Sequence, residues 1–329
     1  MDTSNFEYIV SQCQTLNANL NKPNVSLGIA YMIIGLIYVV LYIPCMVGIL
    51  NPVNFKLSCY KIMAVMGAID IATLSIGVMS GYFSIVGVSV CTCPTLMLIS
   101  GHCVMGFWTT YCGVCIYLGI NRCADVYKSR FMEVIFKGYR IWLFILIPIT
   151  FGLCVLLFGP AMYYSSSLGV WFFDIDPNSE REGNVLHLLV NTVCVAVILL
   201  QYVAISARLY MMTRSQSKLK KMSPAARSVL MQTFLISIPL LIASSMYIII
   251  QFVSMPPVFT IISELTWQSC HGDMAIIYLV FNSSMRIKFL QTLHCIKGTR
   301  ENIALHCIDY LSNKWTESPR DRHGCDVKQ

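Results

Sequence analysis

The residues best suited to chemistry in this 329-residue chain are ionisable side chains inside long apolar runs. Asp70 lies within the apolar run 57–83, and Glu264 and His271 lie within the run 259–285. An ionisable group inside a bilayer costs at least about 2.5–3.5 kcal/mol on insertion scales, so each needs a compensating role. Asp70 either bonds to a neighbouring helix or serves as a conformational switch or cation site facing Asn282 and Ser284. The functional role, as a conformational switch or cation site, is favoured.

Polar residues recur at spacings of four and three along the run 259–285, which places them on one helical face. These residues are Glu264, Gln268, His271, Tyr278 and Asn282, with Ala275 among them. The face must look into a bundle, because lipid offers it no partners. It either provides hydrogen bonds between helices or forms the wall of a ligand pocket, and the sequence leaves both open. Trp267 neighbours His271 one turn away, whereas Asp273 lies on the opposite face with no predicted partner unless Gly272 bends the helix.

Composition identifies the elements that must position these side chains. Hydrophobic residues make up 56% of the chain, charged residues only 12%, and the mean hydropathy is +0.66. This charged fraction is roughly half that of a soluble domain and far too small for a disordered chain. The sequence therefore predicts a polytopic membrane protein. Its 15 Cys lie mostly inside apolar runs, where Cys behaves as a small hydrophobe.

Seven apolar runs are long enough to cross a bilayer as helices. They are 27–50, 57–83, 94–121, 141–163, 185–211, 229–255 and 259–285. With the N-terminus outside, 21 of the 23 Lys and Arg residues fall on one side of the membrane, and only Lys22 and Arg181 fall on the other. Positive charge gathers on the cytoplasmic side, so the N-terminus is predicted outside and the C-terminus inside. The net charge of +7 thus reflects topology, and no nucleic-acid partner is predicted.

Three regions follow from this topology. Residues 1–26 form an extracellular tail, residues 27–296 the seven-span domain, and residues 297–329 a flexible cytoplasmic tail. Residues 286–297 predict a short amphipathic helix on the inner leaflet, where Cys295 is a candidate for palmitoylation. Arg122 ends the third span and either snorkels to the membrane boundary or engages a cytosolic partner.

Seven spans, an Asp in the second and an Arg ending the third together resemble a G-protein-coupled receptor. More specifically, the chain resembles the nematode serpentine chemoreceptors of class T (Srt). The resembling stretches are LYIPC at 41–45, CYKIM at 59–63, GYFSI at 81–85, NRC at 121–123, WFFD at 171–174, and Trp267-Gln268, His271-Gly272, Ile277-Tyr278-Leu279, Asn282 and Arg286 in the last span.

The resemblance implies a chemosensory receptor at the plasma membrane, in a sensory-neuron cilium, that passes its signal to a heterotrimeric G protein. A small-molecule ligand would bind in the outer half of the bundle. Candidate pocket residues are His102, Trp108, Tyr247, Gln251, Glu264, Trp267 and His271. Candidate residues for switching and coupling are Asp70, Asn121, Arg122, Tyr278, Asn282 and Arg286.

Departures from the rhodopsin-like pattern bear on activation. Asn121 stands where an acid is usual, which leaves Asp125 as the evident partner of Arg122. Arg286 stands where Tyr is usual, and no Pro follows Asn282. The loop 161–184 contains no Cys, so the usual disulfide to it cannot form, and either Cys91 or Cys93 is expected to pair with Cys13 in the N-terminal tail.

Two other classes compete with a receptor. A seven-span zinc hydrolase would need ligands from His102, His187, His271 and Asp70, yet no two of the histidines are closely spaced. A transporter or channel would need more ionisable groups along a path than Asp70, Glu264 and Asp273 supply. A retinal-based pump is excluded, since the last span contains no Lys. No catalysis, metal or cofactor is therefore expected; ligand identity, G-protein subtype and oligomeric state are not predicted.

Overall fold

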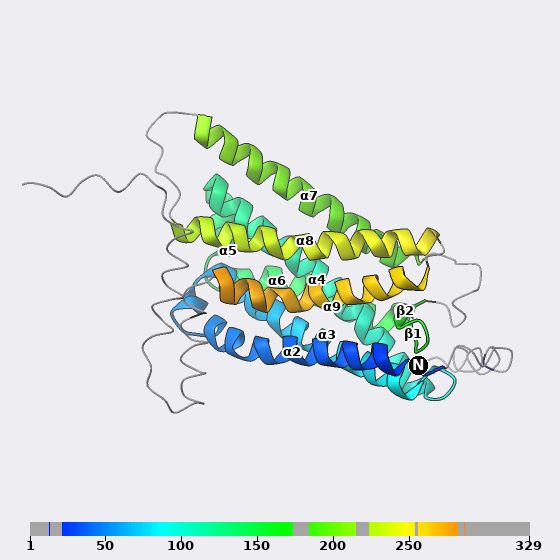
Figure 1. Ribbon diagram of the computed structural model, residues 1–329. Helices are drawn as coiled ribbons and strands as arrows, with labels where there is room; N and C mark the ends of the chain where they lie inside the picture. Colours follow the sequence, from blue (N-terminus) through cyan, green and yellow to red (C-terminus); the bar gives the residue numbers. More distant parts are fainter. Residues whose placement is uncertain are drawn as a thin grey trace, which may run out of the picture.

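The computed structural model of the chain is a bundle of long helices (Figure 1). It describes residues 13, 22–173, 184–214, 224–253, 256–281 and 286. The long helices in these segments are α2 (Val25–Ile49), α3 (Ser58–Val86), α4 (Pro94–Tyr127), α6 (Arg140–Phe158), α7 (Val185–Arg214), α8 (Pro224–Phe252) and α9 (Pro257–Phe281). Shorter elements join them: η2 (Asn54–Lys56), α5 (Arg130–Phe136) and an antiparallel hairpin of β1 (Tyr163–Ser165) and β2 (Val170–Phe172).

Six of the described helices are long and apolar enough to cross a membrane: α2, α3, α4, α6, α7 and α8. Helix α9 has 25 residues but falls outside this group. Its hydropathy is lowered by Glu264, Gln268, His271 and Asp273. The first three are fully buried in the bundle, so their polarity is hidden from lipid. The sequence prediction of a helical bundle with seven long helices agrees with these elements.

Several predicted boundaries differ from the helix ends in the structure, two of them for a clear reason or by a large margin. The fourth apolar run was expected to continue to residue 163, but α6 ends at Phe158 and Gly159 is extended. Pro160 follows, and the residue before a proline is disfavoured in helical conformation. The third helix is longer than expected and ends at Tyr127 instead of residue 121. The hairpin of β1 and β2, in the connection between α6 and α7, was not predicted. Asn282, Cys295 and the expected amphipathic helix lie outside the described residues, apart from Arg286.

Helices α2 and α3 pack unusually close together. A Cβ atom added to Gly28 would lie 2.5 Å from the carbonyl oxygen of Gly81, and one added to Gly81 would lie 2.6 Å from that of Gly28. Small residues at such a crossing let two backbones approach within van der Waals contact. The close packing fixes the depth of α3 relative to α2, and therefore the height of Asp70.

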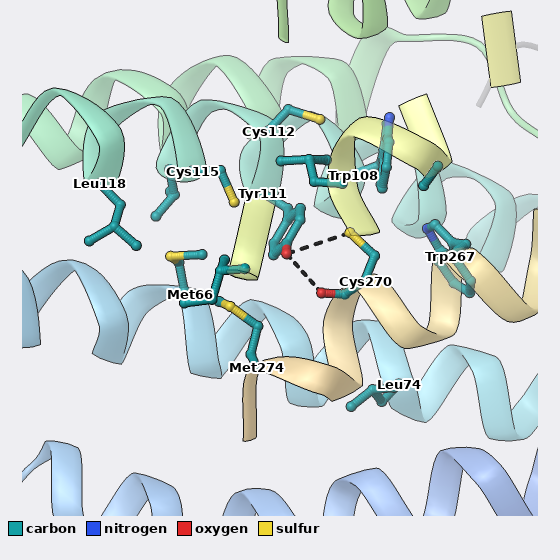
Figure 2. Packing of buried hydrophobic residues seen from close by; sticks show 14 of the residues in the cluster. Met66, Leu74, Trp108, Tyr111, Cys112, Cys115, Leu118, Trp267, Cys270 and Met274 are labelled. Carbon is teal, nitrogen blue, oxygen red and sulfur yellow. Dashed lines mark hydrogen bonds between the residues drawn. The ribbon is translucent and has the colours of Figure 1, made fainter. Parts of the chain in front are cut away.

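The core joins α3, α4 and α9 through sulfur-containing and aromatic side chains (Figure 2). Met66 and Leu74 of α3 meet Tyr111 of α4 and Met274 of α9 in this cluster. The opposite faces of the helices carry exposed apolar residues, as on α2, where Ile33, Ile37 and Val40 are each more than half exposed. Such bands suit contact with lipid tails.

The bundle has two distinct ends. The hairpin lies at the end where α2 starts, together with the end of α3 and the start of α9 (Figure 1). We call this the hairpin end. The opposite end holds the start of α3 and helix α5, which are joined where the Ser58 hydroxyl donates to the Phe136 carbonyl at 2.6 Å. Arg122 lies toward this opposite end, in the last turns of α4.

Candidate functional site

An acid–imidazole pair lies midway along the bundle. Asp70 of α3 and His271 of α9 are both fully buried, and Asp70 Oδ1 lies 2.7 Å from His271 Nδ1. The second oxygen, Asp70 Oδ2, accepts a hydrogen bond of 2.5 Å from the Tyr42 hydroxyl of α2. The pair and the phenol thus connect three helices. Asp70 was expected to face Asn282 and Ser284, which lie outside the described residues; the partners observed here are His271 and Tyr42.

The pairing explains how these groups tolerate burial. The Asp70 carboxyl and the His271 imidazole bond to each other, so each has a polar partner in the core. Breaking such a buried pair by removing one partner typically costs about 3–5 kcal/mol. His271 Nε2 has no hydrogen-bond partner among the described residues, so the imidazole retains one unused site.

Aromatic rings enclose His271. The Tyr111 ring centroid lies 4.3 Å from that of His271, and the centroids of Trp267 and Trp108 lie at 5.6 and 6.1 Å. The Tyr111 hydroxyl donates to the carbonyl of Cys270 at 2.8 Å, which ties α4 to α9 (Figure 2). The imidazole is therefore held against one ring and in edge contact with two others, so displacement of α9 would disturb all three.

A second acid lies on the same face of α9, nearer the hairpin end. Glu264 and Gln268 are fully buried, and neither the carboxyl oxygens nor the amide atoms have a hydrogen bond of good geometry to any described residue. The phenols of Tyr31, Tyr164 and Tyr247 lie close enough to interact electrostatically with Glu264. Unlike Asp70, Glu264 has no described counter-charge to compensate its burial.

The hairpin covers the region of Glu264 and is held by hydrogen bonds that link it to α2 and α3. The Tyr31 hydroxyl donates to the Gly169 carbonyl at 3.1 Å, and Trp171 Nε1 donates to Ser80 Oγ at 3.1 Å. The Tyr164 hydroxyl oxygen lies 2.7 Å from Ser84 Oγ. Burial raises the pKa of the Tyr164 phenol, and the Glu264 carboxylate raises it further, so the phenol stays neutral beside that acid.

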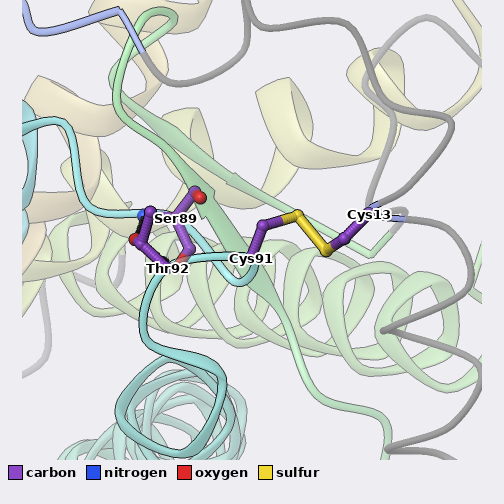
Figure 3. The surroundings of a disulfide bond; sticks show 4 residues. All are labelled: Cys13, Ser89, Cys91 and Thr92. Atoms are coloured by element: carbon purple, nitrogen blue, oxygen red, sulfur yellow. Dashed lines mark hydrogen bonds between the residues drawn. A yellow bond between two sulfur atoms is a disulfide. The ribbon is translucent and has the colours of Figure 1, made fainter.

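A disulfide fastens the N-terminal tail at this end. Cys13 is bonded to Cys91, in the connection between α3 and α4 (Figure 3). Of the two partners that the sequence left open, Cys91 forms the bond and Cys93 is a free, exposed thiol. Cys91 is held within a turn in which the Thr92 hydroxyl and the Ser89 backbone bond to each other.

Helices α7 and α8 contact the residues around Trp108 through interactions that were not predicted. Trp108 Nε1 donates to Asn191 Oδ1 at 3.2 Å, and Gln251 Nε2 lies 2.8 Å from His187 Nδ1. Tyr247 meets His187 edge to face at 5.6 Å between ring centroids. The sequence signal for this contact is the four-residue spacing of His187 and Asn191, which places both on one face of α7.

The pocket candidates from the sequence are therefore not equally placed. Trp108, Tyr247, Gln251, Glu264, Trp267 and His271 are joined by the ring contacts, hydrogen bonds and electrostatic interactions given above. His102 is different: it is only partly buried, and its Nδ1 has no hydrogen-bond partner within the described segments. No hydrogen bond links it to the other candidates.

At the opposite end, Arg122 is buried and held by its neighbours on α4. Its Nη2 donates to Asn121 Oδ1 at 2.6 Å, and its Nη1 forms a salt bridge with Asp125 Oδ2 at 2.8 Å. The Asp125 side chain is 59% exposed, so this pair reaches solvent. Asp125 is the partner that the sequence indicated. The buried guanidinium of Arg122 is thus paired with an acid, Asp125, that water or a protein surface can contact.

Two further predicted residues, Tyr278 and Arg286, and Asp273, for which no role was predicted, have structural contacts with their neighbours in the described residues. Tyr278 is buried, and its hydroxyl lies 3.9 Å from Met274 Sδ. Arg286 Nη1 donates to the carbonyl of Val280 at 3.0 Å. Asp273, for which the sequence suggested no partner, accepts a 2.7 Å hydrogen bond from the Tyr38 hydroxyl of α2.

A bundle of seven long helices, apolar outside and with ionisable groups in its core, defines a multi-pass membrane protein of the seven-helix receptor class. Residues 1–303 match the family model described as serpentine type 7TM GPCR chemoreceptor Srt, so the chain belongs to the Srt chemoreceptor family. It is also 24% identical over 288 residues to serpentine receptor class T-55 of Caenorhabditis elegans, covering 84% of this chain and 78% of that relative. This is a family of receptors and not of enzymes.

Proposed function

We propose that this protein is a chemosensory receptor of the plasma membrane, in a sensory cilium, that binds an environmental small molecule and activates a heterotrimeric G protein. The single observation that carries the proposal is the polar face of α9. Along one buried face it presents Glu264 and Gln268, which have no hydrogen bond of good geometry to any described residue, and then an acid-paired imidazole, His271. Lipid offers such a face no partners, whereas a ligand can supply them.

The hairpin end is proposed to face outward. With this orientation, 21 of 23 basic residues are cytoplasmic, and the connection after the hairpin contributes Asp174, Asp176, Glu180 and Glu182 to the outside. The Cys13–Cys91 disulfide then lies on the oxidising side of the membrane, where disulfides persist. The ligand would enter among α4, α7, α8 and α9 at this end.

The signal is proposed to pass along α9. A ligand that engages Glu264 and Gln268 acts on the helix that also holds His271 against Asp70 of α3. It can shift the receptor between two states only by its difference in affinity for them. The state favoured by ligand is one in which the cytoplasmic ends part and Arg122 exchanges its exposed partner Asp125 for the G protein.

The coupling role is tested by Arg122→Ala in receptor reconstituted with G protein. Agonist-stimulated nucleotide exchange, using a compound found by screening, is expected to fall at least tenfold at matched receptor concentration. Arg140→Ala is the matched control, because Arg140 is an exposed arginine at the start of α6 and carries the same charge. Exchange that is equal in the Arg122 variant and the wild type would remove Arg122 from coupling.

Topology is tested separately with one epitope at each end of the chain in intact cells. Antibody is expected to label the N-terminal epitope directly and the C-terminal epitope only after permeabilisation. Labelling of the C-terminal epitope in intact cells would reverse the orientation and contradict the proposed function.

A further inference from the structure

The Glu264 carboxyl is enclosed by protein yet makes no bond of good geometry with it. Both oxygens have no accessible surface and no hydrogen bond of good geometry in the described segments, and the same holds for the oxygen and nitrogen of the Gln268 amide one turn along α9; the two side chains interact with each other. Glu264 also takes part in no salt bridge there. Buried polar groups in folded proteins are nearly always bonded, so these four atoms retain capacity for a further partner such as a ligand or water.

We propose that Glu264 and Gln268 are the recognition groups for a ligand that carries a protonated amine. The inference rests on the proposed function for the location of the ligand, and it adds the ligand's chemical class. Glu264 would accept N–H hydrogen bonds and supply the counter-charge, and the Gln268 carbonyl oxygen would accept a further N–H. The apolar body of the ligand would lie toward the rings of Trp108, Tyr111 and Trp267 around His271.

The charges and rings of the site favour a cation over an anion or a neutral group. A carboxylate repels anions, and a neutral hydroxyl would leave its charge without a counter-ion. An ammonium group provides both the charge and two or three donors, and charge-assisted hydrogen bonds are stronger than neutral ones. The phenols of Tyr31, Tyr164 and Tyr247 lie within electrostatic range of the acid, and aromatic rings attract desolvated cations.

The remaining acids do not offer the same site. Asp70 is already bonded by His271 and Tyr42, and Asp273 by Tyr38. Asp273 is on the same helix as Glu264 but on its other face, and it has a hydroxyl partner. It therefore provides a matched control for removing one negative charge from α9.

The test uses purified full-length receptor in nanodiscs and pairs of compounds that differ only in charge. The probes are 2-phenylethylamine with 2-phenylethanol, cyclohexylmethylamine with cyclohexylmethanol, and hexylamine with hexan-1-ol. Thermal stabilisation across a concentration series gives the relative affinity within each pair. Wild-type receptor is expected to bind at least one amine tenfold or more tightly than its alcohol.

Variants then assign the preference to a residue. Glu264→Gln is expected to reduce the amine affinity at least tenfold and leave the alcohol affinity within twofold. Glu264→Asp, which keeps the charge, should retain part of the preference, and Asp273→Asn should retain all of it. Equal monodispersity on gel filtration verifies that each variant is folded.

The proposal is overturned if no wild-type amine is preferred over its alcohol, or if the Glu264→Gln receptor keeps the preference. Failure of the proposed function gives a different pattern, in which amines bind through Glu264 but no bound compound changes nucleotide exchange on a G protein. Exchange driven by neutral compounds and unchanged by Glu264→Gln would instead keep the receptor function and reject the amine.

Discussion

Two buried acids, Asp70 and Glu264, are equally removed from solvent, yet their surroundings differ. Asp70 has an imidazole and a phenol bonded to its two oxygens, whereas Glu264 has neither a hydrogen bond of good geometry nor a counter-charge in the described residues. The first arrangement holds three helices together. The second leaves the carboxyl oxygens available to a ligand, as proposed above. Burial alone therefore does not distinguish a structural acid from a functional one; the partners do.

The largest expected effect is that of Asp70→Ala. It leaves His271 and Tyr42 buried without their shared acceptor, which should cost about 3–5 kcal/mol of unfolding free energy. The midpoint of thermal unfolding in detergent should drop sharply, with loss of surface expression. Asp125→Ala is the control, because its acid is mostly exposed and should contribute no more than about 1 kcal/mol. Equal stability of the two variants would contradict the structural role of Asp70.

A smaller loss is expected for Tyr42→Phe, which removes only the hydroxyl bonded to Asp70. Hydrogen bonds to charged groups contribute about 1.5–3 kcal/mol, and the acid keeps His271 as a partner. Tyr38→Phe removes the equivalent bond to the half-buried Asp273 and should cost less. The same thermal unfolding measurement ranks the two; a larger loss for Tyr38→Phe would reverse the assignment of the structural acid.

The smallest effect, and one of opposite sign, is expected for Glu264→Gln. Removing an ionisable group that has no hydrogen bond of good geometry and no counter-charge in the described residues should leave the unfolding free energy unchanged or raise it by up to about 1 kcal/mol, since binding sites often reduce stability. Asp70→Asn, the same change at the other acid, should lower it. Thermal unfolding of the ligand-free receptors compares them, and a clear destabilisation by Glu264→Gln would mean that Glu264 is structural.

The sequence predicted the helical architecture and the inward face of α9, because both depend on local periodicity. Glu264, Gln268, His271, Ala275 and Tyr278 are all buried, as their spacing requires. The Asp70–His271 pair was not predicted, although both residues were singled out. Which residues meet across α3 and α9 depends on the relative depth of the two helices, which is set by packing such as the Gly28–Gly81 approach.

Other features depend on contacts that a single helix does not encode. The hairpin is held by Ser80 and Tyr31 on other helices, and its short strands carry too little pattern to be recognised. Asp273 looked isolated because its partner, Tyr38, is 235 residues away in sequence. The Arg122–Asp125 pair was predictable because three residues on one helix are neighbours.

The role of Glu264 in ligand recognition is tested most directly by comparing wild-type and Glu264→Gln receptors in one dose–response experiment. An agonist found by screening is applied to both at matched surface expression, and nucleotide exchange on the G protein is recorded together with receptor thermal stability. If Glu264 recognises the ligand, the Glu264→Gln receptor should be at least as stable as the wild type but at least tenfold less sensitive to agonist. A variant that is folded, stable and fully responsive would contradict this role, because Glu264 would then take no part in ligand recognition.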